Sequence, residues 1–86
     1  MFSQRFQKTV IITAHAQRRM ADRQIDAGLL LDIIETGELR SKTAQQIWIA
    51  KHLTDRNDNL LCIAAVIEEA LVVKTVMHHF TWELPS

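Results

Sequence analysis

The sequence of 86 residues contains one cysteine, one proline, two glycines and no tyrosine. A lone cysteine cannot form a disulfide within the chain, and Cys62 matches no zinc-binding spacing, so we expect a reducing compartment, the cytoplasm. The scarcity of proline and glycine excludes collagen-like, linker-like and low-complexity chains. The longest uncharged apolar run, 60–67, is far shorter than the ~20 residues that span a bilayer. We therefore expect a soluble protein without a membrane partner.

The formal net charge is zero, because ten basic side chains balance ten acidic ones. This excludes bulk attraction to nucleic acid, so binding of RNA needs a local basic patch. The charges are segregated along the chain: residues 1–23 carry five basic side chains and one acidic, and residues 24–39 carry four acidic and no basic. Such segregation is typical of a local positive site, or of two solvated helix faces that neutralise each other.

Length and pattern predict one small domain over residues 1–86, with 1–8 as a loose lead-in. A short β-prone run over 9–13 ends at Thr13, whose hydroxyl is suited to accept from the backbone N–H groups of a following helical turn. Residues 14–23 are rich in alanine, glutamine, arginine and methionine, which favour a helix. The sequence thus predicts a first helix that begins directly after Thr13.

A second helix is predicted over residues 27–36. Asp26 is its N-cap candidate, its apolar residues recur along one stripe, and Gly37 stands where a C-cap glycine is expected. Three later segments have the composition of strands: 46–53, 60–67 and 71–79. We therefore expect an α+β fold in which two N-terminal helices pack on a three- to four-stranded antiparallel sheet.

The first predicted helix carries a polar ridge. His15, Arg19 and Arg23 recur at i, i+4 and i+8, so a helix aligns them on one side. Like charges at this spacing repel, which is tolerated where an anion lies nearby. Arginine supplies planar, permanently charged donors and histidine titrates near neutrality, so the ridge is typical of a phosphate site. The alternative is an exposed helix surface on which Asp22 offsets part of the repulsion.

The remaining histidines and the cysteine do not predict a metal or cofactor site. His78 and His79 are adjacent, so on a strand they point to opposite faces. His15 and His52 have no further ligand at a recognised spacing. Cys62 stands in an apolar run and is expected to be a buried small hydrophobe.

Three strand residues have two interpretations each. Thr75, which alternation places on one face with Val73 and Met77, is either a strand filler or a site residue. Trp48 is suited to stack on a base, or to close the edge of the core. Lys51 interrupts an apolar face, so either its stem packs while its ammonium reaches water, or it faces an anion.

Two sequence blocks have fixed spacings: Thr13-x-His15-Ala16-x-x-Arg19-Met20-x-x-Arg23-x-Ile25-Asp26, and later Val73-x-Thr75-Val76. Over about residues 10–78 the chain resembles a widespread bacterial and phage-associated family of domains of unknown function. Such domains are similar to the barnase–EndoU–colicin–RelE (BECR) ribonuclease group, which places N-terminal helices against an antiparallel sheet. The resemblance therefore implies a RelE-like fold.

The BECR resemblance also implies a toxin that cuts RNA without a metal and is held inactive by an immunity protein or antitoxin. Carried over by matching position, His15, Arg19 and Arg23 are the helix-borne site residues, and Thr75 is their counterpart on the last strand. As a metal-independent endoribonuclease, the chain would use His15 as general base or acid and the arginines to hold the phosphate. His79, which shares the strand face of Thr75 by alternation, would be a second acid–base group.

Two other functions are consistent with the same residues. One is a non-catalytic module that binds RNA or a partner protein through the basic ridge. The other is a structural interaction protein, such as a homodimer that forms through sheet edges or through the apolar region 60–76. The expected partners are thus RNA, an antitoxin or immunity protein, or a second copy of the chain.

Overall fold

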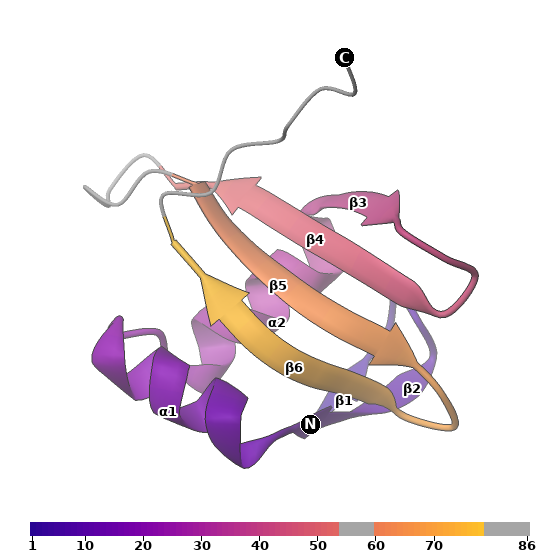
Figure 1. Ribbon diagram of the computed structural model, residues 1–86, viewed down its shortest axis with the longest axis horizontal. Helices are drawn as coiled ribbons and strands as arrows, with labels where there is room; N and C mark the ends of the chain where they lie inside the picture. Colours follow the sequence, from indigo (N-terminus) through magenta and orange to yellow (C-terminus); the bar gives the residue numbers. More distant parts are fainter. Residues whose placement is uncertain (54–59, 79–86) are drawn as a thin grey trace.

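The computed structural model describes residues 1–53 and 60–78 (Figure 1). In chain order the elements are β1 (Phe2–Ser3), β2 (Lys8–Ile12), α1 (Ala14–Asp22), α2 (Ala27–Thr36), β3 (Glu38–Ser41), β4 (Gln46–His52), β5 (Leu60–Ile67) and β6 (Leu71–Met77). The six strands in these residues form one curved sheet, ordered β1-β2-β6-β5-β4-β3. Strand β2 pairs in parallel with β6, and the other neighbouring strands pair antiparallel.

This sheet corrects the predicted fold. The α+β, RelE-like arrangement of two N-terminal helices on a three- to four-stranded antiparallel sheet is wrong, because the sheet is mixed and six-stranded, and two strands precede the helices. β1 has two residues and β3 is exposed at every position, so neither shows the alternation that marks a strand in a sequence. The parallel pairing joins Val10 to Leu71, a contact that no local pattern reveals.

Both helices pack on one face of the sheet. Figure 1 shows α2 behind the central strands and α1 beside β6. The core between them contains Ala16, Met20, Leu30, Ile33 and Ile34 from the helices and Val10, Ile47, Ile49, Leu61, Ile63, Leu71, Val73 and Val76 from the strands. The opposite side of the sheet, here called the open face, presents the residues that alternate with these strand positions, among them Trp48, Ala64 and Val66. A site on the sheet is therefore expected there.

Each helix begins at its predicted N-cap. Thr13 Oγ1 accepts a hydrogen bond from the backbone N–H of Ala16 at 3.1 Å, and Asp26 Oδ1 accepts one from Leu29 at 2.8 Å. The predicted bounds of α2 are confirmed, whereas α1 ends one residue earlier than predicted. Arg23 is the C-cap of α1 rather than a helical residue.

The end of α1 is closed without a glycine. Gln24 adopts a left-handed φ of 55° and donates its backbone N–H to the carbonyl of Ala21 at 3.3 Å. Ile25 then donates to the carbonyl of Met20 at 2.9 Å. These two bonds are the Schellman motif, and its hydrophobic contact is present because Met20 and Ile25 both belong to the core. The turn between the helices is thus fixed by the burial of Ile25.

Gly37 ends α2 at the predicted C-cap, but its backbone is extended, with φ at −72°. The position requires glycine because there is no space for a side chain. A Cβ here would lie 2.6 Å from the carbonyl oxygen of Ile33 and 2.9 Å from that of Ala50. The missing side chain therefore lets the end of α2 approach β4 closely.

Arg5 fastens the N-terminal segment to the end of α2. Its Nη1 donates to the carbonyls of Ile34 at 3.0 Å and Gly37 at 2.7 Å, and its backbone N–H donates to the Glu35 carboxylate at 2.8 Å. Burial alone would raise the pKa of Glu35, but hydrogen bonds from the buried Ser3 hydroxyl and from backbone N–H groups, with the charge of Arg5, hold that pKa below its usual value.

A bulge in β6 separates Thr75 from Val73. Ala65 pairs with Val73 and Ala64 pairs with Thr75, so Lys74 is an extra residue on β6. Val73 is buried in the core, whereas Thr75 shares the open face with its partner Ala64. The alternation that predicted Thr75 and Val73 on one face is therefore wrong, because a bulge resets the alternation of a strand.

Candidate functional site

Two hydrogen bonds tie the start of α1 to β6. The backbone N–H of Thr13 donates to the carbonyl of Val73, and the Thr13 hydroxyl donates to the carbonyl of Lys74, both at 3.2 Å. The pairing of β2 with β6 extends only to Ile12 and Val73, and α1 lies beside β6 from that point on (Figure 1). The first turn of α1 therefore lies at the border of the open face.

His15 and Arg19 occupy exposed positions of α1, next to the buried Ala16 and Met20. Arg19 Nη1 lies 3.9 Å from Asp22 Oδ2, so Asp22 offsets part of the ridge's charge, as predicted. An exposed pair of this kind stabilises a protein by at most about 1 kcal/mol. The Arg19 side chain is still 46% exposed, so its guanidinium remains accessible to an anion.

The other predicted site residues lie in three different settings. Arg23 is half-buried at the C-cap of α1, where its backbone N–H donates to the Arg19 carbonyl at 3.1 Å. Thr75 lies on the open face of β6, one residue after Lys74. His79 lies outside the residues that the structure describes. The junction at β6 thus brings the helix of the ridge beside the strand of Thr75, while Arg23 is a full turn beyond Arg19.

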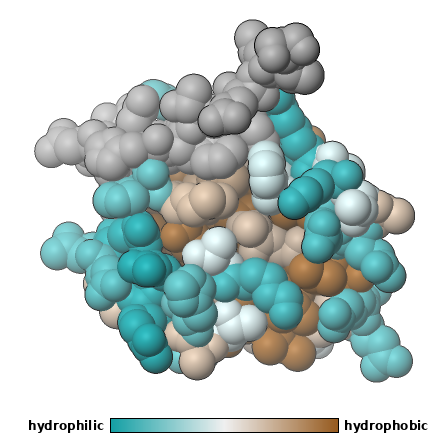
Figure 2. Space-filling model, in the orientation of Figure 1, coloured by the Kyte–Doolittle hydropathy of each residue, from teal (hydrophilic) through white to brown (hydrophobic). Residues whose placement is uncertain are grey.

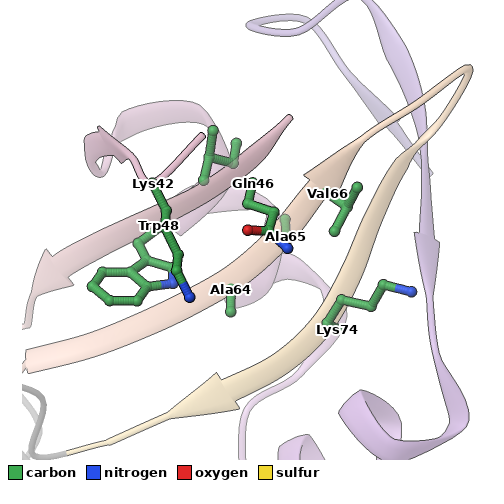
Figure 3. A pocket seen from close by; sticks show the side chains of 8 residues that line it. Lys42, Gln46, Trp48, Ala64, Ala65, Val66 and Lys74 are labelled. Carbon is green, nitrogen blue, oxygen red and sulfur yellow. The ribbon is translucent and has the colours of Figure 1, made fainter. Parts of the chain in front are cut away.

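A hollow of about 210 Å³ opens on the open face across β4, β5 and β6 (Figure 3). Trp48 and Lys42 lie on one side of it and Lys74 on the other, with Gln46 and the small Ala64 between them. Figure 2, which looks onto this face, shows apolar and neutral side chains over the central strands and hydrophilic ones on the side of α1. The hollow therefore has an apolar floor and basic ends.

The sheet register relates this hollow to Thr75. Arg40 pairs with Trp48, Trp48 with Ala64, and Ala64 with Thr75, so the four residues form one row across the open face. Neighbouring strands lie about 4.8 Å apart, which puts the Cα atoms of Trp48 and Thr75 roughly 10 Å from each other. Because Ala64 has only a methyl group, no large side chain of the row stands between them.

The electrostatics of the hollow are one-sided. Among the residues that the structure describes, its lining includes Lys42 and Lys74 and no carboxylate. Within residues 1–53 and 60–78, neither ammonium takes part in an ion pair. Lys42 is positioned by its backbone N–H, which donates to the carbonyl of Gln46 at 2.8 Å, and Lys74 by the bulge. The hollow is thus suited to an anion that also has an apolar or aromatic part.

Metal-ligating and nucleophilic groups are not assembled in the described part of the chain. Residues 1–53 and 60–78 contain no cluster of three His, Cys, Asp or Glu side chains that could hold an ion. Cys62 is fully buried, and this burial raises the pKa of its thiol to about 12, so it is protonated at neutral pH. The groups that α1, β6 and the hollow offer for chemistry include imidazole, guanidinium, ammonium and hydroxyl groups.

Sequence reasoning found part of this site. It identified Trp48 and proposed that its ring stacks on a base or closes the core edge. It did not identify Lys42, Gln46 or Lys74. Alternation along the strand over 46–53 was the available signal for Gln46 and Trp48, whereas the placement of Lys74 depends on a bulge that is not visible in the sequence.

Comparison with known proteins gives one result. No curated protein and no solved structure matches the chain significantly. Within residues 1–53 and 60–78, neither helix has the length and apolar character needed to cross a membrane. Residues 12–78 match the family described as "Domain of unknown function (DUF4258)", a match that spans α1 to β6. The predicted membership of an uncharacterised family is confirmed, and the match itself carries no ribonuclease relationship. The chain therefore belongs to the DUF4258 family.

Proposed function

We propose that this domain is a metal-independent endoribonuclease of the toxin type that acts on RNA in the cytoplasm. The observation that carries the proposal is the double hydrogen bond of Thr13 to β6, which sets the helix of His15 beside the strand of Thr75. An imidazole titrates near neutral pH and is therefore suited to take and return a proton. The exposed Arg19, one turn further along α1, supplies a guanidinium for the phosphate.

The proposed reaction is an internal transesterification. His15 takes the proton of the ribose 2′-hydroxyl, and the 2′-oxygen attacks the adjacent phosphorus. The bond from phosphorus to O5′ breaks, and O5′ leaves with a proton from water or from His79. Arg19 and Arg23 stabilise the negative charge that develops on the phosphate oxygens, and Thr75 donates a hydrogen bond to one of them. The products are a 2′,3′-cyclic phosphate and a 5′-hydroxyl.

The test is cleavage of labelled single-stranded RNA by the purified protein in excess EDTA. We expect cleavage with 2′,3′-cyclic phosphate ends, and a loss of about 100-fold or more in rate for His15→Ala, the range typical of a general acid–base group. Arg19→Ala is expected to lose cleavage as well. Arg18→Ala is the matched control, because Arg18 is a neighbouring exposed arginine of α1 outside the ridge.

Two results would contradict the proposal. One is cleavage that persists unchanged in His15→Ala and Arg19→Ala, which would point to a contaminating nuclease. The other is an equal loss in Arg18→Ala, which would show that only the general charge of α1 matters. Circular dichroism on each variant establishes that the fold is retained.

A second function, RNA binding without cleavage, is favoured by Lys42 and Lys74, two cations that border a hollow whose described lining has no carboxylate. If the protein binds RNA in a salt-dependent way and the RNA stays uncleaved in the assay above, the domain is a binding module and not a nuclease.

The proposed toxin type requires an inhibitor protein. The cations that would hold RNA, Arg19, Lys42 and Lys74, are also the groups that an acidic surface of an antitoxin or immunity protein would cover. We expect expression of the protein to arrest growth of the host unless a neighbouring gene product is present. We also expect the His15→Ala variant to allow growth. An equally toxic His15→Ala variant would contradict it.

A further inference from the structure

We propose that the hollow on the open face is a nucleotide subsite, in which Trp48 stacks on a base and Lys42 and Lys74 hold the flanking phosphates of a single strand. This inference rests on the proposed function for the identity of the ligand as RNA. It adds the substrate class, since a stacked base must be exposed, which selects single-stranded RNA over a duplex.

The charge distribution is the first argument. The two lysines border the hollow on different elements, Lys42 on the turn after β3 and Lys74 on β6, and Figure 3 shows the Lys74 side chain extending outward from the hollow. Neither has an ion-pair partner in residues 1–53 and 60–78, although the chain as a whole has equal numbers of acidic and basic side chains. Two cations that the described residues leave without an ion pair border one hollow, and the described lining of this hollow has no carboxylate. Such a hollow is complementary to a polyanion.

The aromatic surface is the second argument. Trp48 lies at the edge of the hollow with 36% of its surface exposed, and Figure 3 shows its indole on the side of Lys42. Buried apolar residues already fill the helix side of β4 through Ile47 and Ile49, so the indole is not needed to complete that core. Every nucleobase has a π-face, and stacking on an accessible indole is a common means of holding a single strand.

The size of the hollow is the third argument. At about 210 Å³ it is smaller than the roughly 300–1,000 Å³ of pockets that enclose a drug-sized ligand. It therefore fits one planar ring of a longer ligand better than a whole small molecule. Its lining includes the small Ala64 of the open face, so a nucleic acid strand has room to continue across the face.

The bulge in β6 connects the subsite with the proposed cleavage site. It turns both Lys74 and Thr75 toward the open face, although neighbours in a regular strand point to opposite faces. The carbonyl of Lys74 also accepts the Thr13 hydroxyl at the start of α1. A phosphate on Lys74 is thus near both Thr75 and the helix of His15, and the stacked base on Trp48 belongs to a nucleotide close to the scissile bond.

The test measures binding separately from cleavage. The probe is a fluorescently labelled single-stranded oligonucleotide with 2′-deoxyribose throughout, which cannot be cleaved through a 2′-hydroxyl, and binding is followed by anisotropy. Trp48→Ala is expected to weaken binding roughly 5- to 100-fold, the range for loss of one stacked base. Trp48→Phe keeps an aromatic ring and is expected to restore most of the affinity.

Lysine variants test the charge. The double variant Lys42→Ala, Lys74→Ala is expected to weaken binding and to reduce the slope of log affinity against log salt by about 1 to 2. The matched control is Lys8→Ala, because Lys8 lies at the start of β2, outside the hollow. A duplex of the same sequence is expected to bind more weakly than the single strand.

Three results would overturn the subsite, and a fourth separates it from the proposed nuclease. Equal affinity of the protein, Trp48→Ala and the double lysine variant would show that RNA binds elsewhere. No measurable binding of any single strand would leave a protein partner as the occupant of this face. RNA cleavage that depends on His15 but not on Trp48 refutes the subsite alone, whereas binding that depends on Trp48 without RNA cleavage refutes the nuclease alone.

Discussion

The hydroxyl of Thr13 donates to the backbone carbonyl of Lys74 while it accepts from the first turn of α1. One side chain therefore caps a helix and joins it to a strand 61 residues away. This contact joins the start of α1 to β6, the strand whose Lys74 lines the hollow of the open face.

Thr13→Ala removes both contacts. We expect a loss of about 1–3 kcal/mol in the free energy of unfolding, the sum of an N-cap and one further hydrogen bond. Thr13→Ser keeps the hydroxyl and is expected to lose less than half as much. Urea denaturation of the two variants measures the difference. Equal losses would show that the threonine methyl group, rather than the hydroxyl, matters.

Gly37 and Gly28 offer a matched pair of substitutions. Gly37→Ala forces a Cβ against the carbonyls of Ile33 and Ala50, and we expect a loss of about 1–3 kcal/mol. Gly28→Ala places its Cβ 3.4 Å from the Asp26 carboxylate within a helix, where alanine is favoured by up to about 1 kcal/mol. Thermal unfolding should therefore move in opposite directions for the two variants. A neutral Gly37→Ala would contradict the close approach of α2 to β4.

Glu35 predicts a specific acid sensitivity. Its pKa is lowered in the folded protein, so the unfolded chain takes up the proton first as the pH falls. The stabilisation is therefore complete above the ordinary glutamate pKa of 4.5 and is lost as the pH drops through the lower pKa of the folded protein. Glu35→Gln should flatten this acid limb in urea denaturation at a series of pH values. Glu69→Gln, which removes an exposed carboxylate near β6, is the control. An unchanged limb in Glu35→Gln would refute the assignment.

Cys62 is expected to be unreactive in the folded protein. Its thiol is fully buried, and burial raises its pKa to about 12, so both access and thiolate are lacking at neutral pH. A thiol reagent such as DTNB should react only at the rate at which the chain unfolds, and rapidly in urea. Immediate reaction of one thiol per chain in buffer would contradict the burial.

The sequence predicted the two helices well, because a helix depends on residues that are close along the chain. Thr13 and Asp26 cap the helix starts, and the apolar stripe of α2 marks its buried side. The prediction failed where the structure depends on contacts between residues that are far apart in the sequence. Lys51 interrupts the apolar face of β4 because its ammonium binds Asp32 at 2.6 Å and Thr36 at 2.8 Å on α2, a contact that alternation cannot foresee. The edge strands β1 and β3 lack an apolar pattern, and the bulge at Lys74 places Thr75 on the opposite face from Val73, which alternation had put on the same face.

The parallel pairing of β2 with β6 has a consequence for synthesis. Strand β2 must wait for β6 before it gains this parallel neighbour, so the contacts of highest sequence separation form late. A growing chain that has emerged only as far as β5 lacks Lys74, Thr75 and the anchor of α1 altogether. The open face is therefore assembled only after the ribosome has synthesised β6.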